Sequence, residues 1–217
     1  MYLLFIADFV RTDFPGGPTG WATPRHLFYN LIDMTKDGGL GAVILKNQIA
    51  IEDTMARASI EACRHANGRD WWVMIPKSRS NCYFLLLVTP DGVGAPNLIC
   101  TGVEWTGDSG EAYFTPDGTK FVRIDKGMGL HLYDFDNTNG ILVYNSSIVP
   151  IQDVWAVAVG ASISPNSKYL YVSLLDKLFQ YDLKAPDIPA SRVLLAVPDT
   201  VPEGRIVQQG KLAVMRP

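Results

Sequence analysis

Two segments of this chain repeat one pattern of strands and turns at an interval of about 48 residues. Residues 113–135 read YFTPDGTKFVRIDKGMGLHLYDF, and residues 162–183 read SISPNSKYLYVSLLDKLFQYDL. The prolines of the two copies, Pro116 and Pro165, lie 49 positions apart. Self-similarity at this period is typical of stacked supersecondary units, above all of β-propeller blades. The repeat therefore predicts an all-β fold, and it constrains architecture far more than activity.

The turns of the two copies have a physical basis. Residues 115–118 (TPDG) place a proline with a preset φ two positions before a glycine that tolerates a positive φ. Residues 164–167 (SPNS) repeat the turn, and we expect Asn166 to be the residue that takes the left-handed backbone there. Short aromatic and aliphatic segments on either side predict strands.

Placing the rest of the chain on the same frame gives one domain, residues 1–217, built from repeating units. The units are 1–56 (partial), 57–103, 104–149, 150–197 and 198–217 (partial). We expect an incomplete ring of about four blades of the WD-like or lactonase-like type. One stretch leaves two alternatives open, because the composition of Arg57–Arg64 suits either a blade strand or a helical insertion.

Composition and charge exclude several classes of protein. Apolar residues make up 47% of the chain, charged residues 19%, and the net charge is −3, which suits a β-rich globular protein without a basic surface for nucleic acid. No apolar run approaches the roughly 20 residues of a membrane-spanning helix. Cys63, Cys82 and Cys100 are too few and too widely spaced for a zinc site. They allow one disulfide with a spare thiol or three buried thiols, and we expect three buried thiols.

The densest set of functional-looking polar side chains lies in residues 62–73, ACRHANGRDWWV. Four of its residues are candidates for ligand binding on a loop: His65, Asn67, Arg69 and Asp70. The alternative is structural, with Asn-Gly forming a turn, an arginine–aspartate network, and Trp71 and Trp72 packed between sheets. The composition of the segment favours the structural alternative.

Other conspicuous residues recur at matching positions of the repeat. A catalytic site needs unlike residues that meet once, so recurrence predicts a structural role. The recurring residues are Pro116, Asp117, Gly118, Tyr133, Asp134, Pro165, Asn166, Tyr181 and Asp182. We expect a structural role for these residues and for Trp71. The oxygen-rich residues 134–139 lack the loop pattern of a calcium site, and no nucleophile, phosphate-loop or dinucleotide motif is present. We therefore expect no metal and no cofactor.

The run HANGRDWW, residues 65–72, resembles a segment of large secreted proteins of Bacteroidota that carry a type IX secretion sorting domain or a PKD-like domain. The likeness extends over most of residues 28–190. In such proteins the region looks like a propeller of about seven blades, which needs about 340 residues at this period. The resemblance implies that this chain is a piece of a larger parent chain that is secreted or displayed at the cell surface.

Two functions from different classes are compatible with these features. The first is a non-catalytic propeller segment that serves as a scaffold or binding module for protein or glycan partners. The alternative is a lactonase-like hydrolase whose central metal is held by side chains of several blades, with His65, Asn67 and Asp70 as donors beside residues of missing blades. Because no catalytic constellation is visible, we expect a binding module rather than an enzyme. A WD-repeat adaptor is less favoured, since the repeats lack the Gly-His and Trp-Asp pairs.

Overall fold

The computed structural model describes residues 1–8, 10–11, 22–57, 59–107, 110–125, 128–149, 160–174 and 177–197. These residues form strands connected by turns, with two short 3-10 helices, η1 (Asp37–Gly39) and η3 (Pro189–Ser191). The all-β prediction is confirmed. No sheet in the described ranges closes on itself, so the ring of blades stays a prediction. The partial unit expected at 198–217 lies outside the described residues.

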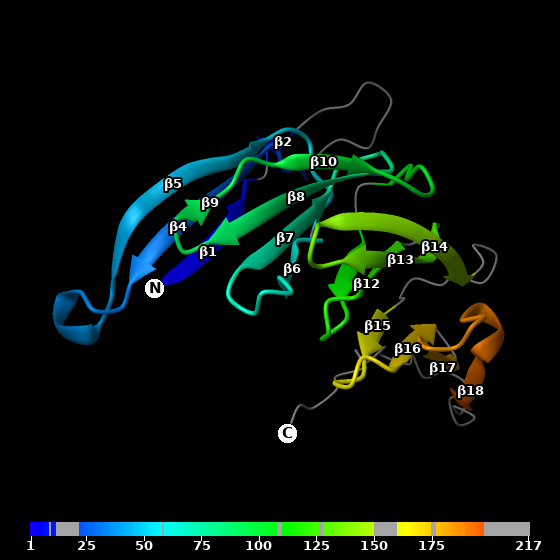
Figure 1. Ribbon diagram of the computed structural model, residues 1–217. Coiled ribbons are helices and arrows are strands. Elements are labelled where there is room, and N and C mark those ends of the chain that lie inside the picture. Colours follow the sequence, from blue (N-terminus) through cyan, green and yellow to red (C-terminus); the bar gives the residue numbers. More distant parts are fainter. Residues whose placement is uncertain are drawn as a thin grey trace, which may run out of the picture.

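Four antiparallel sheets follow one another along the chain (Figure 1). The first sheet has the order β1 (Tyr2–Ala7), β4 (His26–Asp33), β5 (Ala42–Glu52). The second sheet runs β6 (Glu61–Arg64), β7 (Trp71–Pro76), β8 (Cys82–Thr89), β10 (Asn97–Cys100), with β9 (Gly92–Val93) paired to β8. The third runs β11 (Glu111–Phe114), β12 (Lys120–Asp125), β13 (Gly129–Asp136), β14 (Ile141–Val149). The fourth runs β15 (Gly160–Ile163), β16 (Tyr169–Leu174), β17 (Lys177–Asp182), β18 (Val193–Ala196). A ribbon of β2 (Val10–Arg11) and β3 (Ala22–Thr23) completes the set.

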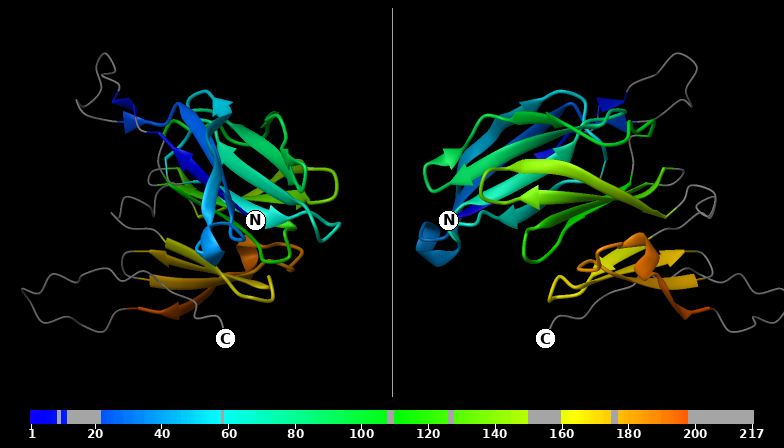
Figure 2. Two further views of the ribbon diagram at one scale, coloured as in Figure 1. Left: turned by 90° about the vertical axis from the view of Figure 1, so that its left-hand side faces the viewer. Right: turned by 45° about the vertical axis from the view of Figure 1, so that its right-hand side comes forward.

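The sheets are stacked face to face, with the first sheet at one end of the stack and the fourth at the other (Figure 2). In β8, Tyr83 and Leu85 belong to the apolar cluster shared with the third sheet, whereas Phe84 and Leu86 belong to the cluster shared with the first. Successive side chains of a strand point to opposite faces, so a sheet packed on both sides must be apolar on both. This explains the nearly continuous apolar runs of the central strands.

Each of the last three sheets begins with a short strand at one of its edges. We call β6, β11 and β15 the opening strands. The opening strands β6 and β11 contact one another across the second and third sheets. Glu61–Arg64 is a strand paired with β7, so the strand alternative is correct for the second half of Arg57–Arg64. Among the described residues, no helix has the length and apolar character needed to cross a membrane.

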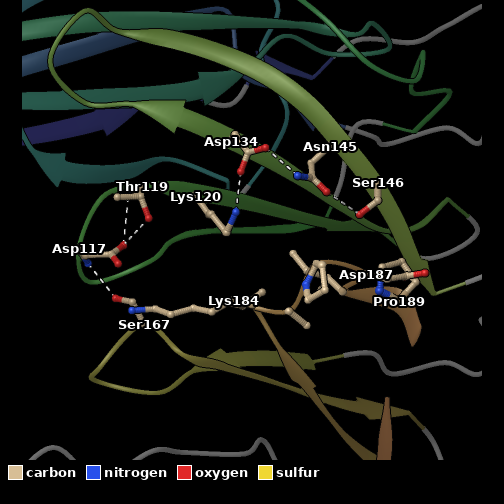
Figure 3. Close-up of a pocket in the computed structure, with 14 residues that line it drawn as sticks. Asp117, Thr119, Lys120, Asp134, Asn145, Ser146, Ser167, Lys184, Asp187 and Pro189 are labelled. Atoms are coloured by element: carbon tan, nitrogen blue, oxygen red, sulfur yellow. Dashed lines mark hydrogen bonds and ion pairs between the residues drawn. The ribbon is translucent and has the colours of Figure 1, made fainter. Parts of the chain in front are cut away.

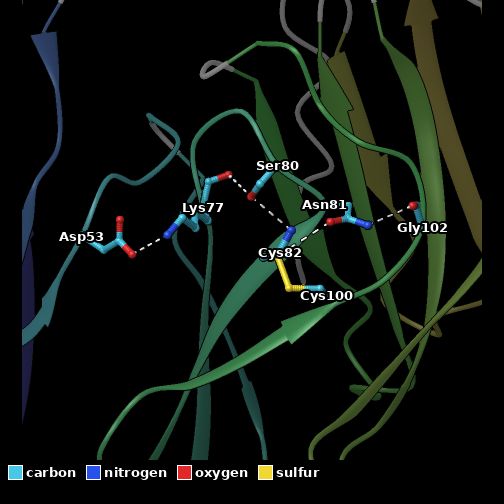
Figure 4. Close-up of a disulfide and its surroundings, with 7 residues drawn as sticks. All are labelled: Asp53, Lys77, Ser80, Asn81, Cys82, Cys100 and Gly102. Atoms are coloured by element: carbon cyan, nitrogen blue, oxygen red, sulfur yellow. Dashed lines mark hydrogen bonds and ion pairs between the residues drawn. A yellow bond between two sulfur atoms is a disulfide. The ribbon is translucent and has the colours of Figure 1, made fainter.

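The expectation of three buried thiols is wrong. Cys82 and Cys100 lie opposite each other in the antiparallel pair of β8 and β10, and they form a disulfide across a sequence separation of 18 (Figure 4). Cys63 is a buried free thiol, and burial raises its pKa to about 12. A thiol in that state is a packing group rather than a nucleophile.

Candidate functional site

The segment with the four predicted binding residues is the turn from β6 to β7. The amide of His65 donates to the carbonyl of Asp70 at 3.0 Å, just as the amide of Thr115 donates to the carbonyl of Lys120 at 2.9 Å in the third sheet. In the fourth sheet the amide of Ser164 donates to the carbonyl of Tyr169 at 2.8 Å. The HANGRDWW segment therefore has the same structural position as the two Pro-containing turns.

The side chains of this turn bond mainly to one another. Asn67 Oδ1 accepts from the amides of Arg69 and Asp70, both at 3.0 Å, and Asn67 Nδ2 donates to Asp70 Oδ2 at 2.7 Å. Arg69 Nε donates to Asp70 Oδ1 at 2.8 Å, and the bonds from Arg69 and Asn67 lower the pKa of the Asp70 carboxyl. His65 stacks on Trp72, with ring centroids 5.4 Å apart. These bonds hold the turn together. A binding role for the four residues stays a prediction.

The recurring turn residues hold equivalent turns, with one difference from expectation. Asp117 Oδ1 accepts from Thr115 Oγ1 at 2.7 Å, and Asn166 Oδ1 accepts from Ser164 Oγ at 2.7 Å. The positive φ of 57° falls on Ser167, not on Asn166 as expected. Ser167 takes the position of Gly118, with φ of 68°, because the side-chain oxygen one residue earlier must point back into the turn. Pro116 and Pro165 precede these residues in the two turns.

In each of the two Tyr-Asp pairs the tyrosine is buried in the core and the aspartate lies near a lysine at the sheet surface. Tyr133 is fully buried and accepts a hydrogen bond from Tyr83 Oη at 2.7 Å, and Tyr181 is buried between the third and fourth sheets. Asp134 pairs with Lys120 Nζ at 2.5 Å, and Asp182 lies 3.9 Å from Lys168 Nζ. Of the two tryptophans expected to pack between sheets, Trp72 is buried. Trp71 instead has 41% of its surface exposed and lies under the Arg64 guanidinium.

A polar cleft of about 800 Å³ lies between the third and fourth sheets (Figure 3). Its third-sheet wall carries the Lys120–Asp134 ion pair, and Asn145 Nδ2 donates to the same carboxylate at 2.6 Å. The amide of Asp117 donates to Ser167 Oγ at 2.9 Å and ties the two sheets together. The carboxylate of Asp134 and the ammonium of Lys120 already neutralise each other. The Asp117 carboxylate, which also lines this wall, accepts hydrogen bonds from Thr115 and Thr119.

Arg123 is a charged residue that the sequence did not single out. It is 1% exposed, and its guanidinium carbon lies 4.0 Å from the centroid of the Trp105 ring. Its two terminal nitrogens have no hydrogen-bond partner within the described ranges. Contact with an aromatic face stabilises a desolvated guanidinium by about 2 kcal/mol. Arg123 is enclosed by the core, so a substrate has no access to it.

Two glutamates stand at the first positions of neighbouring opening strands, and sequence reasoning missed them. Glu61 begins β6 and Glu111 begins β11. Ser59 Oγ donates to the carbonyl of Gly110 at 3.1 Å, which joins the residues that lead into the two strands. The hydroxyl of Tyr113 donates to Glu111 Oε2. We call Glu61, Glu111 and Tyr113 the paired-glutamate site.

The electrostatics of this site differ from those of the turns. Burial raises the pKa of Glu61 to about 7, and no hydrogen bond or ion pair to its carboxylate is found in the part of the chain that the structure describes. Burial, then the bond to Glu111 and the charges of both glutamates raise the pKa of Tyr113, which keeps its phenol protonated. A strongly shifted carboxyl that lines a cavity is a candidate for a functional group. The sequence signal was the dipeptide Glu-Ala, repeated at 61–62 and 111–112.

The metal donors considered in the sequence do not fit a metal ion. The Asp70 carboxylate and the Asn67 carbonyl oxygen already accept hydrogen bonds from Arg69 and from within the turn. Within the described ranges no group of three or more His, Cys, Asp and Glu side chains could hold an ion.

The fold is similar to solved structures of lactonases. A proposed 6-phosphogluconolactonase from Bacteroides uniformis matches with a TM-score of 0.55 and 14% identity over 80% of this chain and 52% of that chain. A proposed 6-phosphogluconolactonase from Bacteroides fragilis matches with a TM-score of 0.49 and 14% identity over 80% and 49%. The periplasmic gluconolactonase of Pseudomonas aeruginosa matches with a TM-score of 0.43 and 12% identity over 82% of this chain and 49% of that chain. The chain spans about half the length of these structures.

No protein-family model matches the chain, and no curated protein matches it in sequence. The resemblance to secreted Bacteroidota proteins therefore stays a prediction. The expectation of a non-catalytic scaffold is corrected, because the Bacteroides uniformis protein that shares this fold is named as an enzyme. That finding favours the lactonase-like alternative.

Proposed function

We propose that this chain is part of a β-propeller hydrolase that opens lactones, with Glu61 as the general base. The observation that carries the proposal is the paired-glutamate site, where Glu61 and Glu111 begin adjacent opening strands and the half-buried Glu61 carboxyl has no partner among the described residues. The shared fold supports it, because the Bacteroides uniformis protein is named as a lactonase. The stacked sheets support the propeller, whose remaining blades would come from the half of the fold that the chain does not span.

The proposed chemistry is addition of water to an ester carbonyl. The Glu61 carboxylate accepts a proton from a water molecule while the water oxygen bonds to the lactone carbonyl carbon. The ring C–O bond then breaks, and the ring oxygen takes up the proton, so that one lactone and one water give one hydroxy acid. A base with a pKa near the working pH combines a large ionised fraction with good proton affinity. Burial gives Glu61 that property.

Glu111 and Tyr113 have a positioning role in this proposal. The Tyr113 hydroxyl donates to Glu111 and stays protonated, which fixes the phenol beside the opening strands. The charge of Glu111 also favours the protonated form of Tyr113. We take lactones of sugar acids as the first substrates to test, since the structural relatives are named for 6-phosphogluconolactone and gluconolactone.

The disulfide supports a location outside the cytoplasm for the proposed enzyme. Structural disulfides persist in oxidising compartments and are rare where thiols are kept reduced. The bond joins strand β8 to the edge strand β10 of one sheet, so it is part of the folded structure of the chain. Secretion or cell-surface display is compatible with this proposal.

The test is hydrolysis of δ-gluconolactone and its 6-phosphate by the purified chain, followed by pH-stat. We expect kcat/KM to rise with pH through about 7, as Glu61 loses its proton. Glu61→Gln should lower kcat by about 10²-fold to 10⁴-fold and remove that limb of the profile. Glu104→Gln is the matched control, because Glu104 is exposed and lies outside the site. Equal kcat in Glu61→Gln and the native chain would falsify the assignment.

A further inference from the structure

Within the described ranges, the first sheet lacks an element that each of the other three has. In the third sheet, Asp136 at the end of β13 accepts from the amide of Thr138 at 2.9 Å, in the turn to the last strand. In the first sheet, Asp33 at the end of β4 accepts from the amide of Thr35 at 2.9 Å, in the turn to β5. Strands β4 and β5 thus correspond to the third and last strands of a four-stranded sheet. Strand β1 corresponds to a second strand, and no opening strand accompanies it within the described ranges.

The burial of β1 agrees with this assignment. The second strands β7 and β12 are buried at nearly every described position and β16 at two of its six, whereas no residue of β1 is buried. Leu3 and Phe5 pack against the second sheet, and Tyr2, Leu4 and Ile6 are exposed at 64%, 48% and 48%. In the described part of the chain, β1 pairs with β4 alone, so one edge carries backbone groups without a strand partner.

The space beside β1 is an open cavity, whereas an opening strand occupies the corresponding space beside β7 and β12. The opening strands β6 and β11 contact each other, but a cavity of about 990 Å³ separates β1 from β6. Tyr2 and Leu3 line one side of this cavity, and Ile60, Glu61 and Ala62 line the other. An edge strand of apolar residues is a template for a further strand.

We propose that the free edge of β1 binds one more antiparallel strand, supplied by the half of the lactonase-like fold that this chain does not span. The length of the Bacteroides uniformis structure supports this source, because the chain covers 52% of it. The inference concerns assembly and does not depend on the proposed hydrolysis. The added strand would also enclose Glu61, whose own strand forms the opposite wall of the cavity.

The other opening strands define the chemistry of the occupant. All three are four residues long and have alanine at the second position: Ala62, Ala112 and Ala161. Each leads into its second strand through the same turn. The occupant is therefore a four-residue strand with a small second side chain, antiparallel to β1 and followed by a Pro-Asp-Gly type of turn.

The chain itself provides the probe. A copy of residues 110–119 (GEAYFTPDGT) is joined directly to Met1, so that Met1 takes the place of Lys120. This register follows from the side-chain faces, since Leu3 and Phe5 face the next sheet as Val122 and Ile124 do. The control carries the same extension with the copies of Ala112 and Tyr113 changed to proline, which cannot continue a strand ladder.

We expect hydrogen exchange of the β1 amides to slow at least about tenfold in the extended chain and not in the proline control. The melting temperature should rise by a few degrees for the extended chain alone. Equal exchange in both extended chains would overturn the proposal. So would slow exchange in the unextended chain together with a dimeric mass by light scattering, because a second copy would then occupy the edge. Neither readout measures hydrolysis, so failure here is distinct from failure of the proposed function.

Discussion

At the scale of the residue, Glu61 links stability to pH in a direction opposite to that of an ion-paired acid. Its pKa rises from 4.5 to about 7 on folding, so the folded chain keeps a proton that the unfolded chain releases between those values. Stability therefore falls as pH rises through this window. The shift corresponds to at most about 3 kcal/mol, and solvent at a partly buried carboxyl reduces it to about 1–2 kcal/mol.

Glu61→Gln removes this effect because the amide does not ionise. We expect the variant to unfold at higher urea concentration than the native chain at pH 8, and the difference to shrink at pH 4.5. Urea unfolding at the two pH values measures it, with Glu104→Gln as the control. A difference that is the same at both pH values would mean that the amide acts through packing and not through the proton.

At the scale of the element, the repeated turn is the unit that can be altered most cleanly. Asp117 Oδ1 accepts from the Thr115 hydroxyl and from the Thr119 amide and hydroxyl. Burial raises the pKa of Asp117, but these bonds outweigh it and lower the pKa. Asp117→Ala should reduce stability by about 1–2 kcal/mol, and Asp117→Asn by less, because Asn166 already fills this role in the next turn. Thermal unfolding of both variants gives the comparison, and equal losses would show that the charge, not the acceptor oxygen, holds the turn.

The turns and strands were also the features that sequence could predict, because local rules for proline, glycine and alternating apolar residues determine them. Sequence placed the left-handed residue at Asn166 rather than Ser167, since the hydrogen bonds of the asparagine side chain are not visible in a one-dimensional pattern. It missed Glu61, because a raised pKa depends on burial by strands that are distant in sequence. The disulfide was missed for the same reason: only the register of β8 and β10 brings Cys82 to Cys100.

At the scale of the whole molecule, each apolar cluster of the described residues joins neighbouring sheets, so stability is approximately a sum of sheet and interface contributions. The second sheet shares apolar clusters with both the first and the third, and the disulfide fastens its edge strand β10 to β8. Loosening this sheet therefore weakens two interfaces. A cross-link over a separation of 18 residues restricts the unfolded chain by about 3 kcal/mol.

Replacing Cys82 and Cys100 together with serine should lower the free energy of unfolding by about 2–3 kcal/mol. Reduction of the native chain with dithiothreitol should give a similar loss, and it should leave the double variant unchanged. Cys63→Ala is a weaker control, because it removes a buried sulfur without touching the cross-link. Hydrogen exchange should rise in the first, second and third sheets, whose interfaces involve β8, more than in the fourth. Exchange that rises equally in all four sheets would show that the stack unfolds as one cooperative unit instead.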